Sequence, residues 1–139
     1  MSEITYAIEP QLDAQEFADV LRRSTLGKRR PIDDPAAMRG MVAHADIIAT
    51  AREPGGLLVG VSRALTDYTW CTYLSDLAVD VAWQRRGIGR ELIRQTHLAA
   101  GLGTSLVLLA APAAETYYPH IGMKAHRSCW RIARGDRLR

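Results

Sequence analysis

The sequence predicts a mixed α/β fold, in which a largely antiparallel central sheet is flanked by helices. Two short apolar runs, 47–51 and 57–61, flank a Pro/Gly turn, and this pattern is typical of an antiparallel hairpin. A helical pattern over 87–100 separates strand patterns at 70–80 and 105–110. Because a helical crossover of this kind joins parallel strands, we expect the last part of the sheet to be parallel.

The N-terminal part begins with a strand pattern, since residues 4–8 alternate between apolar and polar side chains. Asp13 followed by Glu16 is a capping-box pattern, so we expect a helix to begin there and to end near Gly27. The apolar residues of that helix recur at helical spacing and should face the core. They are Phe17, Val20 and Leu21.

A second helix is predicted over 34–45, with Pro35 at its first helical position. The basic stretch 28–31 between the two helices is expected to be a loop. Residues 66–67 mark the turn into the long strand 70–80.

The C-terminal elements complete the predicted order. A short helix is expected over 113–120 and a last strand over 129–133. The inner side of helix 87–100 should comprise Ile88, Leu92, Thr96 and Ala99.

The composition fits one globular domain spanning residues 1–139, which lies within the common size range of domains. No apolar run approaches the roughly 18 residues of a membrane span, and the first residues lack the pattern of a secretory signal. We therefore expect a cytoplasmic protein that does not bind membranes. Cys71 and Cys129 form no disulfide framework and are expected to be buried, reduced thiols.

The net charge of +3 and the pI near 9.1 suit either nucleic acid or a polyanionic small molecule. The arginines are not interleaved with aromatic residues, and no nucleic-acid-binding motif is present. We therefore expect a small-molecule partner and no nucleic acid.

A candidate anion site lies where strand 70–80 passes through a turn into the following helix. Gly87 and Gly89 leave backbone N–H groups uncovered at the helix start, where the helix dipole favours an anion. Arg85, Arg86 and Arg90 add full positive charges. A tight strand-to-helix turn without a ligand is the structural alternative for the same glycine pair.

Two other phosphate loops do not fit this segment. A dinucleotide-binding fingerprint requires a third glycine or alanine, and Leu92 stands in that position. The G-K-[ST] ending of a mononucleotide-binding loop is absent from the sequence.

The run from Leu77 to Arg90 resembles the acetyl-CoA-binding motif of the GNAT superfamily of N-acetyltransferases, in which a strand leads through a turn to [QR]-x-x-G-x-[GA]. The predicted order of elements is also similar to that fold, so the resemblance covers nearly the whole chain. Val81 departs from it, because relatives often carry proline there. The chain is also weakly similar to a branch that contains plant-type serotonin N-acetyltransferases. The matching stretches are residues 29–31, 50–51, 58–60 and 65–67.

The resemblance implies an acetyl-CoA co-substrate, no metal, and an acceptor that is a small-molecule or peptide amine; it is compatible with a homodimer. The backbone of Leu77, Ala78 and Val79 would pair with the pantetheine arm, and the Val79 N–H would polarise the thioester carbonyl. The pyrophosphate would be held by the turn and the helix start. The residues concerned are Gln84, Arg85, Arg86, Gly87, Ile88, Gly89 and Arg90.

Acetyl transfer requires loss of an amine proton, stabilisation of the oxyanion and protonation of the departing thiolate. The resemblance makes Tyr118, four residues before Gly122, the general acid; a core aromatic with a satisfied hydroxyl is the alternative. For the base, strand 105–110 offers no titratable group, and Asp76 is the remaining candidate carboxylate. A β-bulge would be needed to turn Asp76 toward the cleft.

Asp76 has a second possible role, that of a buried structural carboxylate bonded to the backbone. In that case the base would be water relayed by Tyr73 or Ser75. The four histidines show no metal spacing. The sequence therefore predicts an N-acetyltransferase that works by direct attack in a ternary complex. A non-catalytic acyl-CoA-binding regulatory module is the alternative.

Overall fold

The computed structural model describes residues 3–139, and all structural statements below concern that part of the chain. The strands are β1 (Thr5–Ile8), β2 (Ile47–Arg52), β3 (Leu58–Thr66), β4 (Cys71–Val79) and β5 (Ser105–Val107). The helices are α1 (Ala14–Arg23), α2 (Pro35–Ala43), α3 (Ile88–Ala100) and α4 (Tyr117–His120). Three 3₁₀ turns are η1 (Thr25–Arg29), η2 (Val81–Trp83) and η3 (Pro112–Ala114).

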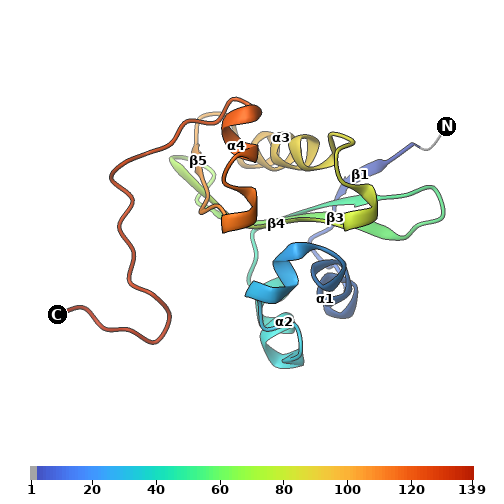
Figure 1. Ribbon diagram of the computed structural model, residues 1–139, viewed down its shortest axis with the longest axis horizontal. Coiled ribbons are helices and arrows are strands. Elements are labelled where there is room, and N and C mark those ends of the chain that lie inside the picture. The colour runs from blue at the N-terminus through green and yellow to red at the C-terminus, as the bar shows by residue number, and fades with distance from the viewer. Residues whose placement is uncertain (1–2) are drawn as a thin grey trace. The chain divides into compact units, whose positions relative to one another are not determined.

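The chain divides into two compact units, of which the first ends at Leu109 and the second spans Ala110–Arg139. The first unit contains a sheet with the strand order β1-β2-β3-β4-β5 (Figure 1). The pairs from β1 to β4 are antiparallel, and β4 pairs with β5 in parallel. The predicted mixed, mostly antiparallel sheet is therefore confirmed.

Aspartate side chains begin the first two helices, as the sequence predicts. The Asp13 carboxylate accepts a hydrogen bond from the Glu16 N–H at 3.2 Å, and Asp34 accepts one from Ala37 at 3.1 Å. The predicted end of the first helix near Gly27 is wrong. Ser24 ends α1 because its backbone is extended and its hydroxyl accepts from the Leu26 N–H, which starts η1.

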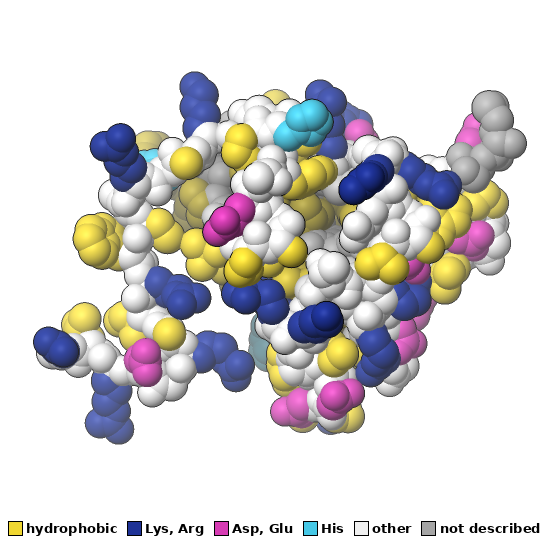
Figure 2. Space-filling view, in the orientation of Figure 1, with side chains coloured by type: hydrophobic (Ala, Val, Ile, Leu, Met, Phe, Trp, Pro, Cys, Tyr) yellow, Lys and Arg dark blue, Asp and Glu magenta, His cyan; other side chains and the backbone are white. Residues whose placement is uncertain are grey.

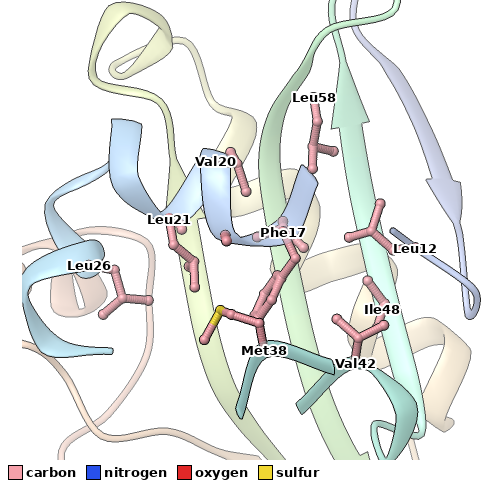
Figure 3. Packing of buried hydrophobic residues seen from close by; sticks show 12 residues of the cluster. Leu12, Phe17, Val20, Leu21, Leu26, Met38, Val42, Ile48 and Leu58 are labelled. Carbon is pink, nitrogen blue, oxygen red and sulfur yellow. The ribbon is translucent and has the colours of Figure 1, made fainter. Parts of the chain in front are cut away.

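Helices cover both faces of the sheet in the first unit. α1 and α2 lie on one face and α3 on the other (Figure 1). Phe17, Val20 and Leu21 are fully buried, as predicted, in a cluster with Met38 of α2 and Ile48 of β2. Figure 3 shows Phe17 and Leu21 pointing toward Met38.

α3 packs on the opposite face through residues four positions apart. Ile88, Leu92 and Thr96 are buried as predicted, but Ala100 continues this row and Ala99 is exposed. Gly60 allows the close approach of α3, because a Cβ there would lie 3.0 Å from side-chain atoms of both Ile88 and Leu92.

The second unit differs from its predicted elements. The helix expected over 113–120 is divided between η3 and α4. Pro119 explains this, since it lacks an N–H and is tolerated in the first turn of α4 but not inside a longer helix. The strand expected over 129–133 does not form: Trp130 is 89% exposed, and the segment has no ladder partner among the described residues.

Both cysteines are free, as expected, but they are exposed rather than buried. Within residues 3–139, no helix has the length and apolar character needed to cross a membrane.

Candidate active site

The outer edge of β4 is open over its C-terminal half. β4 pairs with β5 only from Cys71 to Tyr73, and beyond Tyr73 no described strand lies along that edge. Backbone N–H and C=O groups at an open edge can pair with an added extended chain.

The direction of each backbone group in this half follows from the β3–β4 ladder. The Asp80 N–H donates to the Val59 carbonyl at 2.8 Å, so the residue at position 80 faces β3. Because successive residues of an antiparallel strand face opposite edges, Ala78 also faces β3, whereas Leu77 and Val79 face the open edge. Of the three residues predicted to pair with pantetheine, Leu77 and Val79 therefore present their N–H groups outward.

Asp80 fixes the turn that leaves β4. Its carboxylate accepts from the Ala82 N–H at 2.8 Å and from the Arg23 guanidinium at 2.6 Å. Arg23 also donates to the Leu58 carbonyl at 3.0 Å, so α1, β3 and the turn are joined through one side chain. The sequence did not identify Asp80 and Arg23 as residues that shape the site. They are oppositely charged but 57 residues apart, and no local pattern marks them as partners.

The segment between the turn and α3 has an unusual backbone. Arg85 has φ 64° and Gly87 has φ 80°, and only glycine adopts such values readily. The Gln84 side chain donates to the Val79 carbonyl at 3.1 Å, and the Arg86 guanidinium lies 4.6 Å from the centre of the Trp83 ring. These contacts hold the loop in place against the end of β4.

The N-terminus of α3 lacks the side-chain cap that α1 and α2 possess. Gly87 is its N-cap residue and supplies no side chain, and a Cβ there would meet nothing within 4 Å. The side chains of Arg85, Arg86 and Arg90 are exposed around this end. Uncovered N–H groups, the helix dipole and three guanidiniums together suit a pyrophosphate.

Glu91 is the one acidic residue in the first turn of α3. Hydrogen bonds from Arg94 and then Gln95, further along the helix, lower the pKa of its carboxyl group. Its negative charge is thus paired away from the helix start, and the site keeps its preference for an anion.

β4 contains a β-bulge, as the prediction that Asp76 turns toward the cleft required. Arg63 pairs with Asp76 whereas Ala64 pairs with Leu74, so Ser75 is the extra residue. Ala64 clusters with Ala100 of α3, while Ala78, two residues beyond Asp76, packs in the cluster of α1 and α2. The bulge therefore moves Asp76 to the sheet face that α1 and α2 cover.

Asp76 is 1% exposed and forms ion pairs with two arginines. One carboxylate oxygen accepts from the Arg30 Nε at 2.5 Å and the other from the Arg63 Nε. Arg30 also donates to the Ser75 carbonyl, and Arg63 to the Ser75 hydroxyl, each at 2.9 Å. Both oxygens of the candidate base are therefore engaged by guanidinium groups.

Arg30 and Arg63 were not identified as site residues from sequence. Arg63 had a usable signal, because it is the single charged residue within the apolar run 58–65. Arg30 had none, since the basic stretch 28–31 was expected to be an ordinary loop.

Tyr118 lies in the second unit, at the start of α4. Its ring meets that of Tyr117 edge-on, with the centroids 5.3 Å apart. Burial, and to a lesser degree the neighbouring Tyr117, raises the pKa of Tyr118 above its ordinary value of 10.0. A phenol is already protonated at neutral pH, as a proton donor must be, and the raised pKa extends this to more alkaline solution.

Within residues 3–139, no group of His, Cys, Asp and Glu side chains is arranged to hold a metal ion. Figure 2 shows Lys and Arg side chains interspersed with acidic and apolar ones on the face viewed.

Residues 41–124 match the family described as "Acetyltransferase (GNAT) domain". Comparison with curated protein sequences gives no match.

Several solved structures share the fold. A GNAT-family acetyltransferase from Streptococcus pneumoniae is 19% identical, with a TM-score of 0.72 over 95% of this chain and 99% of that one. The aminoglycoside N-acetyltransferase AAC(6')-Iy in complex with CoA is 14% identical, with a TM-score of 0.70 over 96% and 97% of the two chains. The Escherichia coli GNAT-family protein YhbS in complex with CoA is 19% identical, with a TM-score of 0.69 over 89% and 70%.

The family match spans more than half of the chain and includes β4, the turn and α3. The chain therefore belongs to the GNAT family of acetyltransferases and is an acyl-CoA-dependent acetyltransferase.

Proposed function

We propose that this acetyltransferase moves the acetyl group of acetyl-CoA to a primary amine by direct attack within a ternary complex. The observation that carries the proposal is the continuity of an open β4 edge with an uncapped, arginine-flanked helix start. An extended pantetheine chain needs the first feature and a pyrophosphate needs the second.

Acetyl-CoA supplies an activated acyl group, and the residues of the chain bind and orient it. We assign the pyrophosphate to the segment from Gln84 to Arg90, where Gly87, Ile88 and Gly89 provide the helix-start backbone. Leu77 and Val79 are assigned to the pantetheine arm through their outward backbone groups. The Val79 N–H is aimed at the acyl carbonyl, where a fixed donor stabilises negative charge.

We assign proton donation to the departing thiolate to Tyr118, whose phenol is protonated at neutral pH and, because burial raises its pKa, stays so into more alkaline solution. Asp76 was predicted to be either the base that takes the amine proton or a structural carboxylate. We assign it the structural role. Asp76 is 1% exposed, and both of its oxygens already accept from arginine, so uptake of an amine proton would weaken two ion pairs at a position that an acceptor cannot readily reach. Water near Ser75 or Tyr73, which are both partly exposed, then takes the proton.

The acceptor is proposed to be a small-molecule or peptide amine in the cytoplasm. Two free thiols suit that reducing compartment. A homodimer is compatible with the assignment, which requires only one chain.

A screen of amines with acetyl-CoA, followed by release of free thiol, tests the proposal. We expect thiol release to depend on the amine and to be lost in Gly89→Glu. Binding of acetyl-CoA without thiol release for any amine would instead identify a non-catalytic acyl-CoA-binding module.

A further inference from the structure

Arg30, Arg63 and Asp76 form a cluster that contains two guanidinium groups and one carboxylate. We call it the arginine–aspartate cluster. Within residues 3–139, neither arginine forms an ion pair with any other acid. The cluster therefore retains one positive charge at a largely buried position, where an unbalanced charge is unfavourable.

The cluster also retains hydrogen-bond donors. A guanidinium group has five N–H donors. The bonds of Arg30 go to Asp76, Ser75 and the Arg29 carbonyl and use one donor on each nitrogen. Two donors of Arg30 thus remain, and its side chain is 23% exposed, whereas that of Arg63 is 9% exposed. Arg30 is therefore the member that a ligand can reach.

Through Asp76, the cluster lies on the same strand as Val79, whose N–H is assigned to the acyl carbonyl. Asp76 lies three residues before Val79 on β4, and a strand rises about 3.3 Å per residue, so these two residues are roughly 10 Å apart along the strand. The cluster lies on the sheet face covered by α1 and α2, on the same strand that offers its edge to the acyl donor.

We infer that the acceptor carries a carboxylate in addition to its amine, and that Arg30, oriented by Asp76 beside Arg63, binds this carboxylate. The inference rests on the proposed function, because it names the class of acceptor for that reaction. One negative charge balances the one positive charge of the cluster, and a carboxylate matches the planar fork of a guanidinium. The distance along β4 favours acceptors whose amine and carboxylate are several bonds apart.

The probes for this inference are the unbranched ω-amino acids from glycine to 6-aminohexanoate, each paired with the n-alkylamine of the same chain length. Binding is measured by calorimetry on protein saturated with CoA, and transfer by thiol release from acetyl-CoA. We expect the longer amino acids to bind and react better than their alkylamines by about 10- to 100-fold, as charge-assisted hydrogen bonds imply.

Three variants make the test specific. Arg30→Gln should reduce the preference for the carboxylate to near unity without changing CoA affinity, and Arg30→Lys should restore part of it. Arg29→Gln is the matched control, because Arg29 is an exposed neighbour whose side chain lies outside the cluster, and it should keep the full preference.

The outcomes separate this inference from the proposed function. Equal binding of amino acids and alkylamines to the wild-type protein, or a preference that survives in Arg30→Gln, overturns the inference whatever the transfer assay shows. Carboxylate-dependent binding that Arg30→Gln abolishes, without thiol release for any probe, supports the site and contradicts the proposed transfer.

Discussion

Arg63 on β3 and Asp76 on β4 are direct cross-strand partners, and their side chains form an ion pair beside the bulge at Ser75. The bulge and the ion pair depend on each other. Without the extra residue, Asp76 would share the α3 face with Leu74. Without the two arginines, a buried carboxylate would have no counter-charge.

Replacement of Asp76 by asparagine separates its structural role from a role as base. The change leaves Arg30 and Arg63 without their counter-charge, so we expect the free energy of unfolding to fall by about 3–5 kcal/mol. The remaining folded enzyme should keep the pH dependence of wild-type transfer. Denaturant unfolding and a pH–rate profile on one preparation measure both quantities.

Asp33→Asn is the control for that variant, because the Asp33 side chain is 93% exposed. It should change the unfolding free energy by less than about 0.5 kcal/mol. An Asp76→Asn protein of normal stability, with slow transfer that recovers at high pH, would restore Asp76 as the base.

Tyr118→Phe removes one oxygen and keeps the ring, so affinity for CoA should hardly change. The chemical step should slow by roughly 10²- to 10⁴-fold, as expected for a positioned acid. Because burial raises the pKa of Tyr118 above 10.0, the wild-type rate should fall only above that pH, and this limb should vanish in the variant. Single-turnover rates across pH measure both effects.

Tyr117→Phe removes the same oxygen from the adjacent ring and should retain wild-type turnover. If Tyr118→Phe also turns over normally on its best amine, the thiolate departs without this acid and the assignment is wrong.

The tip of the β3–β4 hairpin should respond to acid. Hydrogen bonds from the backbone N–H groups of Trp70, Thr69 and Cys71 lower the pKa of Asp67 from 3.8 to about 2. The stability this adds is fully present above the unfolded-state pKa of roughly 4 and is lost as pH falls through the folded-state value. Wild-type protein should therefore lose more stability than Asp67→Asn between pH 5 and pH 2, as measured by denaturant unfolding. Equal losses, or a carboxyl titration of Asp67 in the folded protein near its ordinary pKa, would contradict this.

The elements of the first unit were predicted well, because short stretches of sequence mark where its helices and turns begin. The caps at Asp13 and Asp34, the hairpin around residues 52–56 and the glycine-marked start of α3 each follow from a few adjacent residues. The second unit was predicted less well. Residues 129–133 have a strand-like sequence, but a strand exists only where another strand pairs with it.

In the candidate site too, residues adjacent in the sequence could be predicted and residues far apart in the sequence could not. The segment from Gln84 to Arg90 is contiguous, so its spacing could be recognised, whereas the partners of Asp76 come from positions 30 and 63. Alternation along β4 could not place Asp76, because one extra residue reverses the face of all that follow. The sequence contains no local mark of the bulge at Ser75.

Calorimetric titration of CoA into wild-type protein and Gly89→Glu tests the assignment of the helix start most directly. The variant places a carboxylate beside the uncovered N–H groups of α3, so we expect wild type to bind CoA and Gly89→Glu to lose binding while staying folded. Gly103→Glu is the matched control: a Cβ at Gly103 meets nothing within 4 Å, and this variant should bind CoA as wild type does. A folded Gly89→Glu protein with wild-type CoA affinity would show that the glycine pair is only a tight turn and that CoA binds elsewhere.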